Sequence, residues 1–227
     1  MKDIIPPEPG FRWRGAEVTR LEGFSDAVFA FSVTLLVVSL EVPKTFHELM
    51  DAMRGFVAFG VCFAVLANIW FNHVRFFRRY GLQTPWAVFL NCALLFFVLF
   101  YVYPLKFLFG GVVFGDGRIE PSEARTLFII YGSGFAAMSL VMALLYLHAW
   151  NKRAALALSS VELGRTSRSL VDNAAMVAVG LLSILLAVAL PPNLVGLAGY
   201  FYFVIPVYFM IAGAIFGRRE RVAIAKA

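Results

Sequence analysis

Residues 20–43 read RLEGFSDAVFAFSVTLLVVSLEVP, and this stretch decides the fold. It is apolar from Ala27 to Leu40 apart from two serines and one threonine. Its polar start contains Arg20, Glu22, Ser25 and Asp26. A carboxylate beside hydrocarbon costs about 3 kcal/mol on insertion scales, so it normally has a partner and a purpose. The stretch therefore predicts a membrane helix that lines an ion pathway, with the remaining helices as its scaffold.

The composition predicts an integral membrane protein. The chain has 227 residues, of which 61% are hydrophobic and 15% charged, and its mean hydropathy is +0.79. Soluble domains have about 45–50% apolar and about 25% charged residues, so much of the excess must face lipid. Cys62 and Cys92 both lie in apolar runs, where cysteine acts as a small apolar side chain. The net charge of +6 is attributed to membrane topology, and no nucleic-acid partner is expected.

Six apolar segments predict six transmembrane helices in one domain that covers residues 1–227. Their expected bounds are 24–42, 55–74, 86–108, 126–149, 169–190 and 195–216. Each reaches or nearly reaches the roughly 20 residues that cross a bilayer core about 30 Å thick. Their lengths favour helices over the short alternating strands of a membrane barrel. Residues 151–168, where apolar and charged residues alternate, predict a short interfacial helix between the fourth and fifth spans.

The distribution of basic residues predicts that both termini lie inside the cell. Of the 20 Lys and Arg residues, 15 then fall on inner segments and five on outer ones. The outer five are Lys44, Arg54, Lys106, Arg118 and Arg125. This bias follows the positive-inside rule. We expect a multi-pass protein of a bacterial or archaeal plasma membrane, in contact with membrane lipids.

Helical geometry gathers one set of side chains along a single edge of the first span. At 100° per residue this edge contains Ala27, Phe31, Thr34, Leu35 and Val38, and Phe24 extends it. One interpretation is a pore-lining edge. The other is an ordinary packing surface, on which the polar side chains donate to carbonyl groups of their own helix.

Polar residues of the first three spans are expected to meet near the inner third of the membrane. The second span runs antiparallel to the first, which brings Trp70 and His73 to the depth of Asp26. Asn91 lies about one and a half turns into the third span. We expect Asp26 to turn into the body of the protein and to converge with His73 and Asn91, with Ser25 and Trp70 as further donors. His73 could equally be an interfacial residue.

These residues resemble a known family. Arg20-x-x-x-Phe24-Ser25-Asp26 is similar to the RxxxFSD signature of the endolysosomal potassium channel family (transmembrane protein 175). The runs FAFSVTLLV, IWFNHVRFF and LNCALLFFVLFYVYP resemble its first, second and third helices, in that order. The similarity covers roughly residues 18–105, and the later spans match only in number and hydrophobicity. Prokaryotic members of this family are single six-helix repeats.

The resemblance implies a homotetramer whose four first helices line a central pore. The family lacks the TVGYG filter of ordinary potassium channels, and this sequence contains none. By position, Phe31 is the constriction and Thr34 supplies a hydroxyl ring, while Leu35 and Val38 form further apolar layers. The family usually has isoleucine or leucine at the constriction, and Phe31 is bulkier. Potassium ions would pass near Thr34, and no cofactor or resident metal is implied.

The main hypothesis is a potassium-permeable cation channel with monovalent cations as its cargo. Arg20 would repel cations at the pore entrance unless it pairs with Glu22 or a neighbouring subunit. The alternative is a secondary transporter that relays protons or binds substrate through Asp26 and His73, although the sequence contains no recognisable inverted repeat. An enzyme is not expected, because the three histidines are far apart and no Cys/His or Ser/His pair stands out.

Overall fold

The computed structural model describes residues 8–15, 17–38, 44–109 and 120–224, and the regular elements in these ranges are all helical. They are α1 (Arg20–Val38), α2 (Phe46–Tyr80), α3 (Pro85–Lys106), α4 (Pro121–Asn151), α5 (Ser160–Ala189), η2 (Pro192–Leu194), α6 (Leu197–Tyr200), η3 (Phe201–Phe203) and α7 (Val204–Ile224). Within the described residues, five segments are long and apolar enough to cross a membrane: α2, α3, α4, α5 and the run Leu197–Ala214. The sixth apolar helix, α1, has 19 residues and is about 28 Å long. The chain is an all-helical, multi-pass membrane protein.

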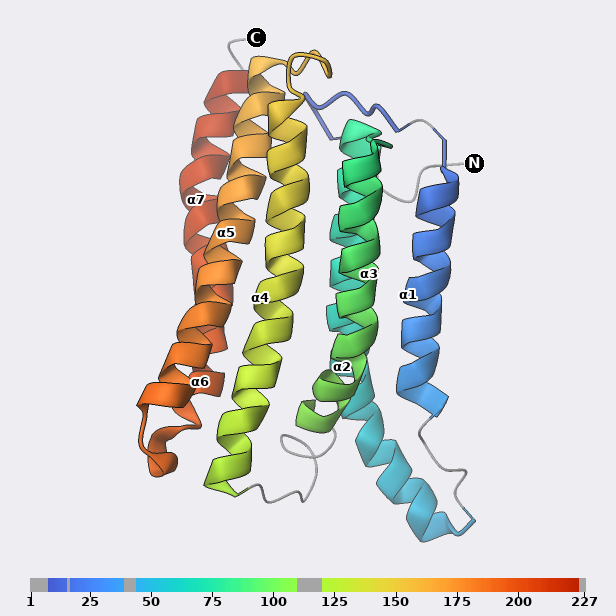
Figure 1. The fold of residues 1–227 in the computed structure, drawn as a ribbon, viewed down its shortest axis with the longest axis vertical. Coiled ribbons are helices and arrows are strands. Elements are labelled where there is room, and N and C mark those ends of the chain that lie inside the picture. Colours follow the sequence, from blue (N-terminus) through green and yellow to red (C-terminus); the bar gives the residue numbers. More distant parts are fainter. Residues whose placement is uncertain (1–7, 16, 39–43, 110–119, 225–227) are drawn as a thin grey trace.

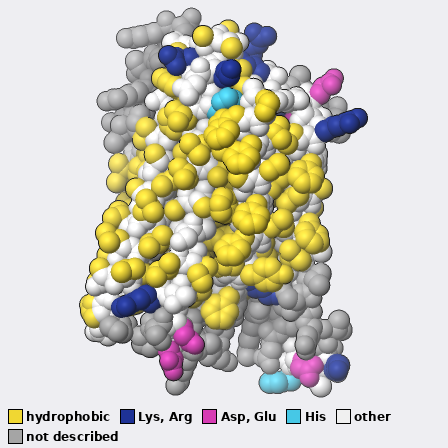
Figure 2. Space-filling model, in the orientation of Figure 1, with side chains coloured by type: hydrophobic (Ala, Val, Ile, Leu, Met, Phe, Trp, Pro, Cys, Tyr) yellow, Lys and Arg dark blue, Asp and Glu magenta, His cyan; other side chains and the backbone are white. Residues whose placement is uncertain are grey.

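The helices form two groups that meet where α3 packs against α4 (Figure 1). The first group contains α1, α2 and α3, and the second contains α4, α5, α6 and α7. Helix α1 packs on α2 and α3, and α1 begins at the same end of the bundle at which α7 ends (Figure 1). On the face drawn in Figure 2, apolar side chains cover the middle of the bundle and charged side chains lie near its two ends. Which side of the membrane each end faces stays a prediction.

Helix α2 is much longer than the predicted span 55–74 and extends beyond it at both ends. Thr45 caps its start, where the Thr45 hydroxyl accepts a hydrogen bond from the Glu48 backbone N–H at 3.2 Å. Its end is set by Gly81, which has a φ of 58° and donates its N–H to the Phe77 carbonyl at 2.8 Å. A Cβ at Gly81 would lie 2.8 Å from the Arg14 carbonyl oxygen, so glycine is required here. Hydropathy detects only the part of a helix that suits lipid, and polar turns extend beyond it.

Helix α5 begins at Ser160, ahead of the predicted span start at 169, so the predicted separate interfacial helix at 151–168 is wrong: residues 160–168 form the first turns of α5. A capping box starts the helix: Ser159 accepts from the Glu162 N–H at 3.3 Å, and Glu162 accepts from the Ser159 N–H at 2.8 Å. The last span is broken, because α6 leads through η3 into α7. For the first span, the predicted residues 39–42 lie outside the described ranges.

Residues 8–15, which we call the N-terminal strap, cross one end of the bundle. The ring of Phe11 packs edge-on against Tyr80, with 5.8 Å between ring centroids. The guanidinium of Arg14 binds both carboxylate oxygens of Glu162, at 2.8 and 2.9 Å. The strap therefore connects the start of α5 to the segment that leads into α1.

Candidate functional site

Helix α1 packs against its own chain through one face only. The buried positions recur at intervals of three and four residues, as they do on one face of a helix. They are Glu22, Ser25, Phe29, Ser32 and Leu36, and each is at most 6% exposed. This face points toward α2 and α3, on which α1 packs.

The predicted pore edge lies on the opposite face of α1. Phe24 and Phe31 are each 56% exposed, and Ala27 and Thr34 are exposed as well. Leu35, at the border of the two faces, is partly buried. By helical geometry, Thr34 points about 160° away from the middle of the buried face. The Val38 side chain lies outside the described part of the structure.

The hydroxyl groups of α1 all donate to carbonyl groups one turn earlier. Thr34 donates to the Ala30 carbonyl at 3.0 Å, and Ser25 and Ser32 do the same at 2.8 Å to Leu21 and Val28. The packing interpretation of this edge predicted such back-bonding, but Phe24, Phe31 and Thr34 are exposed, and Leu35 at the border packs against the core. Because the Thr34 hydrogen is used within the helix, the lone pairs of its oxygen remain available to a cation.

A buried network of side-chain hydrogen bonds joins the first three helices. His73, 1% exposed, donates through Nε2 to Asn91 Oδ1 at 2.7 Å, and Asn91 Nδ2 donates to Ser25 Oγ at 2.9 Å. Asn91 and Ser25 are themselves fully buried. These two hydrogen bonds thus connect one residue from each of α1, α2 and α3.

Asp26 binds Trp70, one of the further donors expected, and not His73 or Asn91. Its carboxylate accepts the indole N–H of Trp70 at 2.7 Å, on an exposed part of the surface. The expectation that Asp26 turns into the body of the protein is wrong for the single chain, because its side chain is exposed. Asp26 lies at the border of the buried face of α1, from which its short side chain reaches sideways to the indole.

Glu22 has a role at the start of α1 that sequence reasoning missed. The Glu22 carboxylate accepts from the Thr19 N–H at 2.9 Å, and the Thr19 hydroxyl accepts from the Glu22 N–H at 3.2 Å. This arrangement is a capping box, and the residues Thr-x-x-Glu at 19–22 were the signal for it. Arg20 itself is exposed on the first turn. The carboxylate proposed as its partner therefore binds the backbone instead.

A second missed contact holds the other end of α1. The ammonium group of Lys106, on the last turn of α3, donates to the Leu36 carbonyl at 3.3 Å. A cation near the last carbonyl groups of a helix is favourable, because the helix dipole is negative there. Sequence reasoning had treated Lys106 only as a topology determinant.

A family model matches most of the first three helices, and a curated relative aligns with nearly the whole chain. Residues 20–101 match the family described as endosomal/lysosomal potassium channel TMEM175. A potassium channel of Marivirga tractuosa is 36% identical over 236 residues, covering 96% of this chain and 95% of that protein. Another, from Chamaesiphon minutus, is 30% identical over 144 residues, covering 59% of this chain and 66% of that protein.

Solved structures agree with these sequence matches. A crystal structure of an alanine variant of the potassium channel MtTMEM175, bound to a nanobody fusion, superposes with a TM-score of 0.82 at 35% identity. The alignment covers 94% of this chain and 100% of that one. The structure of a lysosomal potassium-selective channel TMEM175 homolog from Chamaesiphon minutus gives a TM-score of 0.58 at 25% identity, with 85% and 96% covered. This chain belongs to the endosomal/lysosomal potassium channel TMEM175 family.

Proposed function

We propose that the chain forms a potassium-permeable cation channel, in which the α1 helices of four copies surround a central pore. The observation that carries the proposal is the division of α1 into a buried face and an exposed face, with Thr34 opposite the buried one. Family membership supports it, since the relatives named above are potassium channels. We further propose that the channel works in a bacterial plasma membrane.

The exposed face of α1 suits a pore better than it suits lipid. Asp26 is exposed on this helix, and a charged group within a membrane span normally faces other protein or a water-filled space. Four copies around an axis would place four Thr34 hydroxyl oxygens in one ring. These oxygens replace part of the hydration shell of a cation, while Phe31, Leu35 and Val38 supply apolar layers that gate by dewetting. Four neutral oxygens form a weak site, so we expect modest preference for potassium over sodium.

The transporter alternative receives less support from the contacts of its two key residues. A proton relay between Asp26 and His73 requires a hydrogen-bonded path between them. In the structure His73 binds Asn91 and Asp26 binds Trp70, so each is held by a different partner. His73 is also 1% exposed, which keeps it away from bulk water in the single chain.

The decisive experiment is single-channel recording from the purified protein in planar bilayers, with potassium on one side and sodium on the other. The proposal predicts unitary current steps and a reversal potential displaced toward that of potassium. A carrier would instead give saturable flux that depends on a proton gradient, without unitary steps. Light scattering on the same sample should give a protein mass about four times 25.2 kDa, and a monomeric mass would contradict the shared pore.

A further inference from the structure

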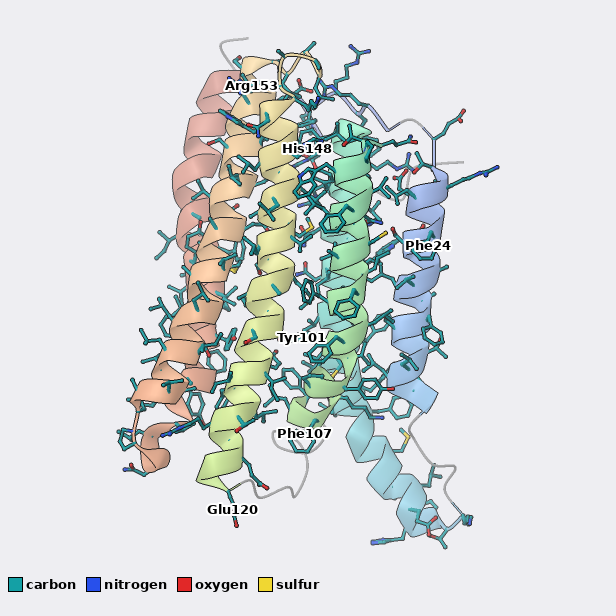
Figure 3. All side chains as sticks on the ribbon, in the orientation of Figure 1. Phe24, Tyr101, Phe107, Glu120, His148 and Arg153 are labelled. Carbon is teal, nitrogen blue, oxygen red and sulfur yellow. The ribbon has the colours of Figure 1, made fainter. Side chains whose placement is uncertain are left out.

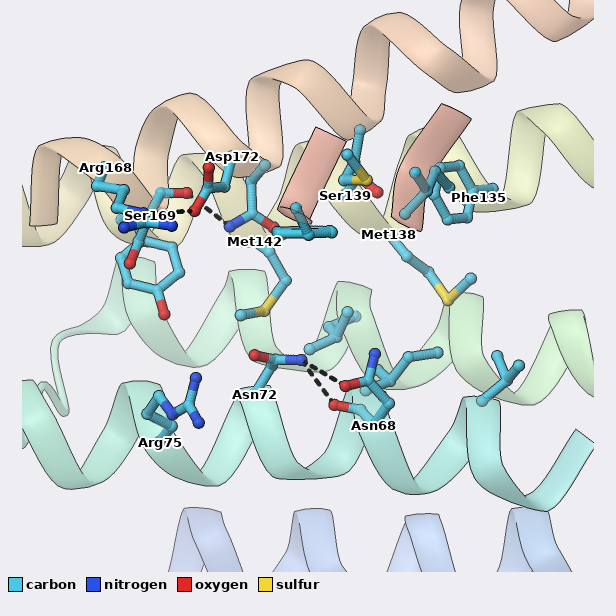
Figure 4. A pocket seen from close by; sticks show the side chains of 18 of the residues that line it. Asn68, Asn72, Arg75, Phe135, Met138, Ser139, Met142, Arg168, Ser169 and Asp172 are labelled. Atoms are coloured by element: carbon cyan, nitrogen blue, oxygen red, sulfur yellow. Dashed lines mark hydrogen bonds and ion pairs between the residues drawn. The ribbon is translucent and has the colours of Figure 1, made fainter. Parts of the chain in front are cut away.

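A large cavity lies between the two helix groups (Figure 4), and α1 contributes none of the described residues that line it. Its volume is about 830 Å³, within the range of roughly 300–1,000 Å³ typical of small-molecule sites. It extends beside α2 from Arg79 to Val65, a distance of about 21 Å at 1.5 Å per residue. Helices α4, α5 and α7 form the opposite wall (Figure 4).

One end of the cavity carries an excess of positive charge. Its described lining includes four guanidinium groups and two carboxylates: Arg75, Arg79, Arg165, Arg168, Glu8 and Asp172. Glu8, from the N-terminal strap, binds Arg79 at 2.6 Å and lies 3.5 and 3.6 Å from Arg75 and Arg165. Asp172 lies 3.6 Å from Arg168 and accepts a hydrogen bond from Tyr208 at 2.8 Å. Among the described lining residues, guanidinium groups therefore outnumber carboxylates by two.

The Arg79 part of this charge is poorly solvated, so an anion would stabilise it. The side chain of Arg79 is only 9% exposed and its Nε is buried without a hydrogen-bond partner among the described residues, whereas the Arg75 Nε has the Glu8 carboxylate at 3.5 Å. Buried guanidinium donors that lack an acceptor are costly. A phosphate group supplies several acceptor oxygens and matches the fork of an arginine.

The rest of the cavity is mainly apolar. Phe135, Met138, Met142 and Met176 line it on α4 and α5, and Phe209 lines it on α7. Methionine side chains adapt their shape to flexible apolar ligands. The amide N–H₂ of Asn72 already donates to Asn68 within the same wall (Figure 4). A charged end and an apolar body in one cavity match an amphiphile with a negative headgroup.

We propose that this cavity binds an anionic phospholipid of the surrounding bilayer. Its phosphate lies among Arg75, Arg79 and Arg168, and one acyl chain extends beside Met142 and Met138. Basic pockets between transmembrane helices bind anionic headgroups in general. The inference depends on the membrane location of the chain alone, and it stands or falls separately from the proposed pore.

The test measures lipid retention by native mass spectrometry, after the protein is taken from nanodiscs that contain equal amounts of phosphatidylglycerol and phosphatidylcholine. We expect about one phosphatidylglycerol per chain to survive mild delipidation, with phosphatidylcholine released. The double variant Arg75→Gln/Arg168→Gln should weaken this retention about 30-fold, because two basic attractions are lost. Its control, Lys152→Gln/Arg153→Gln, removes two charges near the end of α4, outside the cavity, and should change nothing.

A second pair of variants tests the acyl chain without altering charge. Ser139 lines the cavity, whereas Ser133 is exposed on the same helix. Ser139→Phe should fill the tail site and lower phosphatidylglycerol retention, and Ser133→Phe should not. Equal retention of the two lipids, equal losses in both charge variants, or no effect of Ser139→Phe would overturn the proposal. So would full displacement of the lipid by millimolar inorganic phosphate, because the tail would then add nothing to binding.

Discussion

Asn91 of α3 donates its side-chain amide to Ser25 Oγ of α1 at 2.9 Å, while its carbonyl oxygen accepts from His73 of α2. Asn91→Ala would leave a buried imidazole N–H and a buried hydroxyl without this partner. We expect a loss of about 3 kcal/mol in unfolding free energy, since each unsatisfied buried group costs about 1–3 kcal/mol. Denaturant unfolding in detergent, followed by tryptophan fluorescence, measures this.

The control for Asn91 is its neighbour Cys92, which is exposed on α3. Cys92→Ser should change the unfolding free energy by less than about 0.5 kcal/mol. If Cys92→Ser and Asn91→Ala lowered the unfolding free energy equally, the buried hydrogen bonds of Asn91 would not be what holds the three helices together.

If Thr34 forms the proposed ring, Thr34→Ala should lower the preference for potassium over sodium by about threefold, because the hydroxyl oxygens are lost while the proposed pore stays open. Thr34→Ser retains the oxygen and should behave like the parent protein. Reversal potentials under potassium on one side and sodium on the other measure the preference. An unchanged preference in Thr34→Ala, in protein that still assembles, would remove Thr34 from the selectivity mechanism.

Phe31→Ala should raise the unitary conductance and the resting leak, because it removes the largest apolar side chain on the predicted constriction. Phe31 is 56% exposed on α1 in the single chain. Phe89, 59% exposed on α3, is the matched control, and Phe89→Ala should leave both quantities unchanged. If conductance were the same in all three proteins, the constriction would lie elsewhere.

The set of side chains that share one edge of α1 could be predicted from the sequence, whereas the direction of Asp26 could not. Helical periodicity places Phe31 and Thr34 on that edge, but it leaves open whether the edge lines a pore or packs on other helices. Asp26 lies at the border between the two faces of α1, where periodicity does not decide which way a side chain turns. The position of the Trp70 indole decides it, and that depends on how α1 and α2 are packed.

The N-terminal strap and the ends of the helices could not be predicted from local sequence either. Arg14 and Glu162 form their ion pair across 148 positions of the chain, and no periodic pattern connects residues so far apart. The capping boxes at Thr19 and Ser159 were visible as short motifs, and they mark helix starts that lie ahead of the predicted spans. The residues around the large cavity come from the strap, from η3 and from the five helices α2, α3, α4, α5 and α7, so only the assembled fold brings them together.

Glu162→Ala should destabilise the protein by about 2–3 kcal/mol, because the partly buried Arg14 guanidinium loses its charged acceptor and keeps only backbone carbonyl groups. Glu162 is 3% exposed and also accepts the backbone N–H of Arg12 at 2.8 Å. Glu123 provides the control, since it occupies the same third helical position in the capping box of α4 but is exposed. Glu123→Ala should cost about 1 kcal/mol. Similar losses in the two variants would show that the strap adds little to stability.

Gly180 and Gly164 lie on the same helix, α5, and alanine should have opposite effects at the two positions. A Cβ at Gly180 would lie 2.9 Å from the Cβ of Ala136 and 3.1 Å from the Gly132 carbonyl oxygen, so α4 and α5 would have to separate. Gly180→Ala should therefore cost about 1–3 kcal/mol. A Cβ at Gly164 meets no described atom within 4 Å, so Gly164→Ala should stabilise the helix by about 0.5–1 kcal/mol. Thermal unfolding in detergent should give a lower melting temperature for Gly180→Ala than for the parent protein, and a higher one for Gly164→Ala. If the melting temperature fell equally in both variants, close packing of α4 and α5 would not explain the loss at Gly180.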